Sequence, residues 1–139
     1  MSKKQIEFSQ LETGHEFPQS TFKLDTDIIT SYLKAVDDNS YPYHDINMVP
    51  PMAIAALAMG TLSKDINLPS GTVHVSQEFV FTDAVKFDDI LTSHTKIIRN
   101  LSRGKFHMLD IALTIQSQDN RTVLTGKTSF ILPKQDNKG

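Results

Sequence analysis

Residues 50–66, PPMAIAALAMGTLSKDI, decide the fold, because this stretch carries no charged residue before Lys64. Proline is tolerated in the first turn of a helix, so Pro50 and Pro51 predict that a helix starts here. The sequence Leu-Pro-Ser-Gly at residues 68–71 predicts where the helix stops. Since the helix is apolar on nearly every side, we expect it to be buried all round.

Four segments typical of β-strands follow this helix. They are residues 72–81 (TVHVSQEFVF), 90–101 (ILTSHTKIIRNL), 106–117 (FHMLDIALTIQS) and 122–132 (TVLTGKTSFIL). The polar stretches 102–105 and 118–121 predict hairpin turns, so the strands should form an antiparallel sheet. Within residues 106–117 one alternating set is apolar and is expected to face the helix: His107, Leu109, Ile111, Leu113 and Ile115.

The segment before the central helix predicts one more strand and one more helix. Residues 14–24 indicate an N-terminal strand, and Asp25 or Thr26 can cap a helix whose apolar residues recur at helical spacing up to Val36. Residues 37–45, DDNSYPYHD, are rich in turn formers and predict a loop with many functional groups. An antiparallel sheet wrapped around a long central helix is the α+β hot-dog fold, which is the predicted architecture.

Length and composition predict one globular domain over residues 1–139, with flexible ends at about 1–8 and 134–139. The chain is 39% hydrophobic and 22% charged, and its formal net charge of -2 gives no basic surface of the kind that binds nucleic acid. The absence of cysteine excludes disulfides, thiolate metal ligands and a cysteine nucleophile. The histidines are scattered, so no metal site and no cofactor are expected. No signal peptide and no membrane-spanning stretch is evident, so we expect a cytoplasmic protein with no membrane partner.

The order of several motifs resembles the MaoC-like hot-dog dehydratases and (R)-specific enoyl-thioester hydratases, including the dehydratase domains of fatty acid synthases. The motifs are YLKAVDDNSYPYHD at 32–45, VPPMAIAALA at 49–58, LPSGTVHVSQEFVF at 68–81 and DAVKFDDIL at 83–91. The family carries a glycine-aspartate pair in the first of these loops and another in the last. This chain has Asp37-Asp38 and Asp88-Asp89 in their place.

The resemblance implies addition of water to a trans-2-enoyl thioester, or the reverse, with an aspartate and a histidine that hold the water. In the family the aspartate precedes the histidine by five positions. Counting from Asp38 reaches Tyr43, whereas counting back from His44 reaches Asn39. We expect Asp38 to be the general base that orients the water, with His44 or Tyr43 as the acid. A bulge of one residue at Pro42 would let Asp38 and His44 converge.

The start of the central helix is the second expected element of the site. The amides of Met52 and Ala53 lie at the positive end of the helix dipole, where they could polarise a thioester oxygen. Met52, Ala53 and Asn39 are therefore the expected substrate-binding residues.

Three functions stay open at this point. The leading one is an enoyl-thioester hydratase or 3-hydroxyacyl-thioester dehydratase that acts on acyl-CoA or acyl-carrier substrates. The altered spacing and the missing glycines allow a noncatalytic acyl-binding subunit that pairs with an active hydratase half, and a hot-dog thioesterase is a third option. Because an open sheet exposes its edges, we expect a homodimer or a heterodimer of hot-dog subunits. Arg99, Arg103 and Lys105 could meet a phosphate-bearing carrier such as coenzyme A.

Overall fold

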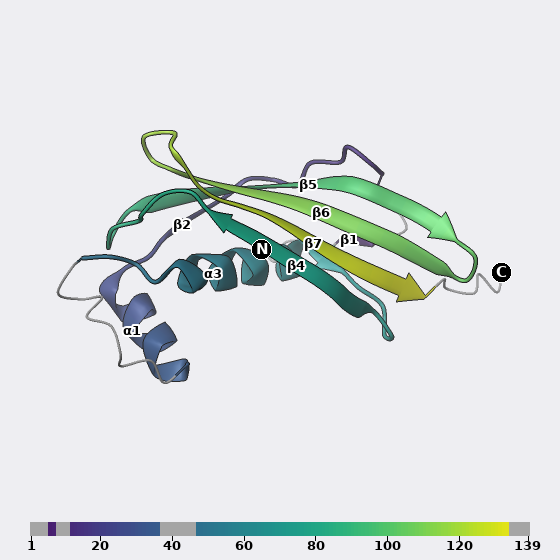
Figure 1. The fold of residues 1–139 in the computed structure, drawn as a ribbon, viewed down its shortest axis with the longest axis horizontal. Coiled ribbons are helices and arrows are strands. Elements are labelled where there is room, and N and C mark those ends of the chain that lie inside the picture. The colour runs from purple at the N-terminus through teal and green to yellow at the C-terminus, as the bar shows by residue number, and fades with distance from the viewer. Residues whose placement is uncertain (1–5, 8–11, 37–46, 134–139) are drawn as a thin grey trace.

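The computed structural model describes residues 6–7, 12–36 and 47–133 of the 139-residue chain. Its elements in chain order are β1 (Ile6–Glu7), β2 (Ser20–Lys23), α1 (Thr26–Ala35), α3 (Pro51–Asp65), β3 (Ile66–Asn67), β4 (Val73–Phe81), β5 (Ile90–Arg103), β6 (Phe106–Ser117) and β7 (Thr122–Pro133). The architecture is the α+β hot-dog fold, with a curved antiparallel sheet along the central helix α3 (Figure 1).

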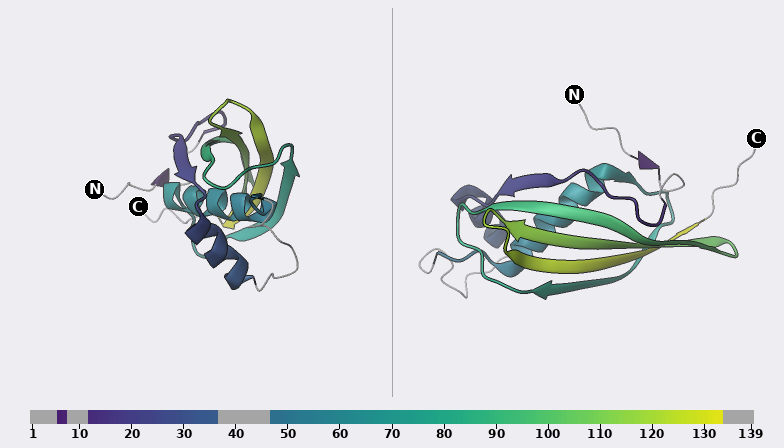
Figure 2. Two further views of the ribbon diagram at one scale, coloured as in Figure 1. Left: turned by 90° about the vertical axis from the view of Figure 1, so that its left-hand side faces the viewer. Right: turned by 90° about the horizontal axis from the view of Figure 1, so that it is seen from above.

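The sheet has five strands in the order β2-β5-β6-β7-β4. The predicted hairpins join β5 to β6 and β6 to β7. Strand β4 comes first of the four long strands but pairs with β7, so it forms one edge of the sheet, and β2 forms the other. The long loop between β4 and β5 therefore carries the chain across one end of the sheet (Figure 2).

The inner face of the sheet and helix α3 form the hydrophobic core. The alternation predicted in β6 is confirmed, because Leu109, Ile111, Leu113 and Ile115 are all buried. They pack in two adjoining clusters with α3 residues such as Ile54 and Leu62. Burial of these side chains on one face of the sheet fixes the register of β6 against its neighbours.

The expectation that the central helix is buried all round is wrong. Helix α3 buries one side, including Ala53, Ile54, Ala55 and Ala58, but the Met52 side chain is 50% exposed and Ala56 and Gly60 are also exposed. These three positions recur every four residues and so form one face of the helix. The sheet of a single chain curves over only part of the helix and leaves this face uncovered (Figure 2).

Both predicted helix starts are confirmed. Asp25 caps α1, since its Oδ1 accepts a hydrogen bond from the Ile28 amide at 2.9 Å, and Pro51 is the first residue of α3. Helix α1 contributes Ile29 and Leu33 to the core and lies at the end of the molecule where α3 begins (Figure 1). Neither described helix is long and apolar enough to cross a membrane.

The N-terminal region differs from the prediction in two ways. The expected strand over residues 14–24 is a regular strand only at Ser20–Lys23, with a separate bridge between Glu16 and Lys96. Pro18 lies between the two pairings and has no amide hydrogen to donate to the sheet. In addition, Ile6 and Glu7 fall in the end expected to be flexible, yet they form β1 and pair in parallel with β3.

Candidate functional site

A largely apolar cavity of about 310 Å³ lies at the N-terminal end of α3. One wall comes from the chain entering α3 and from its first turn, and the other comes from the end of β4 and the segment that follows it. The lining residues are Met48, Val49, Pro51, Ile54, Phe81, Thr82, Asp83, Ala84 and Val85. A concave apolar surface with a few polar groups at its edge is the usual form of a small-molecule site.

The first turn of α3 presents few free amide hydrogens. Pro50 and Pro51 have none, and the Ala53 amide donates to the Pro50 carbonyl at 3.0 Å. Of the two amides expected to bind substrate, the Ala53 amide therefore already has an acceptor within the chain. The amide of Met52 is the first N–H of the helix, at the end where the helix dipole favours negative charge.

Hydrogen bonds hold the second wall of the cavity in place. The Thr82 amide donates to the Val123 carbonyl at 2.9 Å, and the Thr82 hydroxyl donates to the Thr122 carbonyl at 2.8 Å. At the other end of the wall formed by residues 81–85, the Val85 carbonyl accepts a hydrogen bond from the Val49 amide at 2.8 Å. The two walls of the cavity are thus tied to each other and to the start of β7.

Arg121 contacts the same wall from the turn before β7. Its Nη2 donates to the Ala84 carbonyl at 3.3 Å, and its Nε lies 3.3 Å from the Asp83 carboxylate. Both charged side chains are about two-fifths exposed, at 42% and 40%, so solvent screens this pair. The Ser117 hydroxyl donates to Asp119 in the same turn and, with a smaller contribution from Arg121, holds the pKa of the Asp119 carboxyl below its ordinary value of 3.8.

Two residues beside the cavity adopt left-handed backbone conformations. Asn47 has φ 52° and Asp88 has φ 69°, and the Asn47 side chain accepts a hydrogen bond from the Phe87 amide at 3.3 Å. Asp88 occupies the position where the resemblance leads us to expect glycine, and it takes the conformation that glycine adopts most easily. Aspartate is among the few other residues that tolerate it. Aspartate at this position is therefore compatible with the conformation of the loop.

Asp89 fixes the same loop through its side chain. Its carboxylate accepts hydrogen bonds from the Lys86 amide at 2.9 Å and from the Gln118 side chain at 3.1 Å. Gln118 in turn accepts from the Ile90 amide at 3.0 Å. Asp89 thus has a structural role that joins the loop before β5 to the turn between β6 and β7.

The expected catalytic residues lie outside the described part of the chain. Asp38, Asn39, Tyr43 and His44 all belong to residues 37–46, which the structure does not describe. The described chain resumes at Asn47, next to the cavity-lining residue Met48.

The expected substrate-binding residues of α3 are near the cavity but do not line it. The side chain of Met52 is half exposed and Ala53 is buried, whereas their neighbours Pro51 and Ile54 line the cavity. Sequence reasoning also missed Phe81, Asp83 and Arg121. Asp83 is part of the motif DAVKFDDIL, which was the available signal, but its contact with Arg121 is not visible in the sequence.

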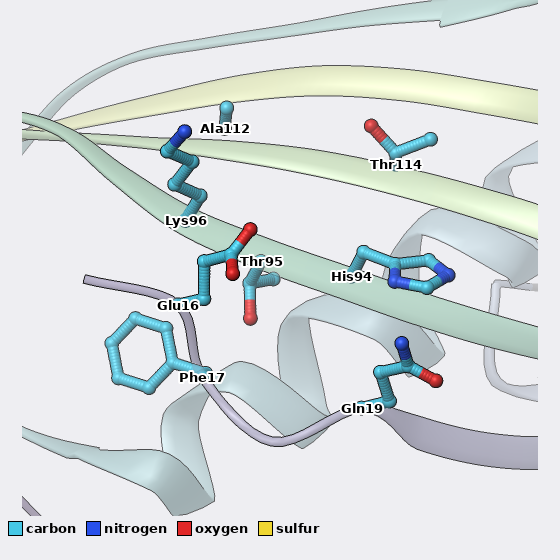
Figure 3. Close-up of a pocket in the computed structure, with 8 residues that line it drawn as sticks. All are labelled: Glu16, Phe17, Gln19, His94, Thr95, Lys96, Ala112 and Thr114. Atoms are coloured by element: carbon cyan, nitrogen blue, oxygen red, sulfur yellow. The ribbon is translucent and has the colours of Figure 1, made fainter. Parts of the chain in front are cut away.

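A second hollow of about 250 Å³ lies between β5 and the segment that precedes β2 (Figure 3). Figure 3 shows residues from three parts of the chain around it: Glu16, Phe17 and Gln19 before β2, His94, Thr95 and Lys96 on β5, and Ala112 and Thr114 on β6. It forms where the chain around Pro18 departs from β5. Charged and polar side chains dominate its lining, so it suits an acyl chain less well than the cavity beside α3.

Within residues 6–7, 12–36 and 47–133, no group of three or more histidine, aspartate or glutamate side chains is placed to hold a metal ion. The described site therefore consists of an apolar cavity, a helix N-terminus and a polar edge. Such a site can hold an apolar chain and polarise an oxygen at its mouth.

A family model described as the FAS1-like dehydratase domain region matches residues 12–126 of the chain. The search of the curated proteins finds no match.

Among solved structures, the (R)-hydratase PhaJ1 of Pseudomonas aeruginosa is similar with a TM-score of 0.76 and 17% identity, over 92% of this chain and 86% of that chain. The HadBC complex of Mycobacterium tuberculosis, a 3R-hydroxyacyl-ACP dehydratase, is similar with a TM-score of 0.68 and 19% identity, over 86% of this chain and 96% of that one. A MaoC-domain dehydratase of Chloroflexus aurantiacus has a TM-score of 0.78 and 15% identity, and the match covers 97% of this chain but 42% of that one. At these identities the likeness shows the fold.

Proposed function

Because the chain belongs to the family of the FAS1-like dehydratase domain region, we propose that it is a hot-dog subunit that hydrates enoyl thioesters or dehydrates 3-hydroxyacyl thioesters. The substrates would be acyl-CoA or acyl-carrier thioesters. The observation that carries the proposal is the apolar cavity at the N-terminal end of α3, beside Asn47, where the described chain resumes after residues 37–46.

The cavity and the helix start support separate parts of this reaction. The acyl chain would lie against Ile54, Phe81 and Val85, and transfer of apolar surface from water would favour its binding. The Met52 amide would polarise the thioester oxygen as negative charge develops on it. The thioester would therefore lie at the mouth of the cavity, on the side where the described chain resumes at Asn47.

The proposed acid and base come from residues 37–46. Asp38 would orient the water and accept its proton, and His44 or Tyr43 would donate a proton to the substrate carbon, with Asn39 in contact with the substrate. A tyrosine has a pKa of about 10 in water, so Tyr43 would need a shifted pKa to exchange protons rapidly near neutrality. His44 is for that reason the stronger candidate for the acid.

A specific observation favours a second candidate, an acyl-binding half that lacks activity of its own. The match covers only 42% of the Chloroflexus aurantiacus dehydratase, so that chain is more than twice as long as its matched part and has room for a second unit of this size. The spacing of Asp38 and His44 also departs from the family pattern. In this alternative the cavity holds the acyl chain and a second hot-dog subunit provides the acid and base.

The experiment that separates these candidates is loss of enoyl absorbance when the purified protein is mixed with short and medium trans-2-enoyl-CoA thioesters. Turnover that is lost in Asp38→Asn and retained in a folded Lys34→Gln control supports the hydratase. Loss in His44→Ala as well identifies the acid. Binding of acyl-CoA without turnover supports the noncatalytic half, and release of free thiol in place of hydration would identify a thioesterase.

Assembly and location belong to the same proposal. The edge strand β4 exposes Val73, Val75 and Val80, at 56%, 53% and 58%, and such an edge favours pairing with a second hot-dog subunit. The proposal also includes a cytoplasmic location, which cell fractionation tests.

A further inference from the structure

The outer face of the sheet carries an apolar row at the end far from the candidate site. Helices α1 and α3 lie on the inner side of the sheet (Figure 1), and the β5–β6 hairpin projects from the end opposite α1 (Figure 2). On the outer face, Leu101, Met108, Ile131 and Val73 are direct cross-strand neighbours, in the order β5, β6, β7, β4. We refer to these four residues as the outer row.

The outer row is accessible in the described chain. Leu101 is 42% exposed and Val73 is 56% exposed, while Met108 and Ile131 are half-buried. Phe106, two residues along β6 from Met108 and on the same face, is 53% exposed. Contiguous apolar side chains on the outside of a sheet are typical of a protein interaction surface.

Positive charge lies beside the β5–β6 hairpin end of the outer row. Strands β5 and β6 and their turn, residues 90–117, contain the cations Lys96, Arg99, Arg103 and Lys105 but one acid, Asp110. That acid is not available to a partner, because its side chain is 5% exposed and its carboxylate lies 2.8 Å from Arg99 Nε. Arg103 and Lys105 are exposed at the hairpin end, next to Leu101 and Phe106.

Charge and composition exclude two simple occupants of this surface. The C-terminal residues 134–139, KQDNKG, follow β7 directly and contain no apolar side chain that could cover the outer row. A second copy docked through the same face would bring two sets of cations together, and such like-charge contacts oppose binding. The surface therefore fits a different partner, one that offers apolar side chains between acidic ones.

We propose that the outer row and the cations Arg103 and Lys105 form a docking surface for an acidic amphipathic helix of another protein. Adjacent strands lie about 4.8 Å apart, so a row across four strands is about 14 Å long. A helix rises about 1.5 Å per residue, so about ten residues span the row with apolar contacts at i, i+4 and i+8. Glutamate or aspartate beside these positions would meet the cations.

The test uses a hydrocarbon-stapled peptide of about 12 residues, because an unconstrained helix of this length is marginal in water. The peptide carries leucine at i, i+4 and i+8 with glutamate at the flanking positions, and a matched peptide carries lysine in place of glutamate. We expect saturable binding of the acidic peptide, with amide chemical-shift changes in β5, β6 and β7. The lysine peptide is expected not to bind.

Matched variants test whether the peptide binds this surface specifically or is attracted to the protein by charge alone. Leu101→Ser with Phe106→Ser, and separately Arg103→Glu with Lys105→Glu, are each expected to raise Kd by about tenfold or more, the usual scale for loss of a contact residue. The controls are Ile28→Ser and the pair Lys23→Glu with Lys34→Glu, which alter exposed residues elsewhere and should leave Kd unchanged. The proposal is overturned by absence of binding, by shifts on another face, or by equal binding of the lysine peptide. It is also overturned if vesicles of anionic lipid bind this face while the acidic peptide does not.

Discussion

At Gly126 the backbone of β7 runs against the ring of Phe79 on β4. A Cβ atom there would lie 2.9 Å from Phe79 Cδ1 and 3.1 Å from the Glu78 carbonyl oxygen, which is backbone and cannot turn aside. We expect Gly126→Ala to lower the free energy of unfolding by about 1–3 kcal/mol, the usual cost of overpacking. Chemical denaturation measures it.

The matched control for this substitution is Gly60→Ala. Gly60 lies in α3, and a Cβ atom added there would meet no other atom within 4 Å. Alanine is the better helix former, so the control should raise the free energy of unfolding by about 0.5–1 kcal/mol. Equal effects of the two substitutions would contradict a steric role for Gly126.

Asp88 and Asp89 are neighbours that contribute to the loop in different ways. Asp88 matters through its backbone conformation, and Asp89 matters through the hydrogen bonds of its side chain. Asp88 has φ 69°, so Asp88→Gly relieves an unfavourable conformation while it adds freedom to the unfolded chain. We expect these effects to offset, with a change in unfolding free energy within about 1 kcal/mol. Asp89→Gly should instead cost about 1–2 kcal/mol, because two hydrogen bonds to its carboxylate are lost. Thermal and urea unfolding compare the two, and a larger loss at Asp88 would contradict this assignment.

At the scale of the element, helix α1 depends on its cap. Asp25 is the N-cap of this helix, and its carboxylate accepts a hydrogen bond from the Ile28 amide at 2.9 Å. Asp25→Ala should therefore lower the free energy of unfolding by about 1 kcal/mol, while Asp25→Ser, which keeps an acceptor, should cost less. Denaturant melts with Asp27→Ala as the control measure this, and an equal loss in both aspartate-to-alanine variants would indicate a general charge effect in place of a cap.

Elements with a local signal could be predicted from the sequence, and those that depend on distant pairing could not. Strand β6 has the predicted bounds, 106–117, because apolar side chains alternate along it between two clear turns. The position of β4 beside β7 was not predictable, since the loop between β4 and β5 is long enough to cross the sheet. Strands β1 and β3 have two residues each, too few for any periodic pattern.

In the candidate site, too, features with a local sequence signal could be predicted, whereas those that depend on tertiary packing could not. Pro50 and Pro51 mark the start of α3 in the sequence, and the cavity does lie there. Which side chains of the first turn face the cavity depends on how α3 rotates against the sheet. An alanine-rich helix leaves that rotation undetermined, so the sequence does not predict that the Pro51 and Ile54 side chains line the cavity. Arg121 reaches Ala84 from far along the chain, through the pairing of β4 with β7.

At the scale of the whole molecule, the uncovered parts of the fold predict self-association or pairing with a related subunit. Strand β4 is an edge strand that exposes four large apolar side chains, namely Val73, Val75, Val80 and Phe81. Helix α3 also leaves Met52, Ala56 and Gly60 exposed. Soluble proteins usually protect such an edge with charges, bulges or a partner, and the bulge between His74 and Ser76 alters only part of it.

We therefore expect the purified chain to form a dimer through β4, or to do so once its hot-dog partner is added. Val75→Lys combined with Val80→Lys places charge on both halves of the edge and should convert the assembly to monomers, as measured by light scattering after size-exclusion chromatography. The control Ile28→Lys adds a charge at an exposed apolar residue of α1, 38% exposed, and should leave the mass unchanged. Circular dichroism shows whether each variant keeps its fold, which separates loss of assembly from loss of structure. If the unaltered chain stays monomeric at micromolar concentration both alone and with hot-dog partners, the edge is protected in some other way and pairing through β4 is wrong.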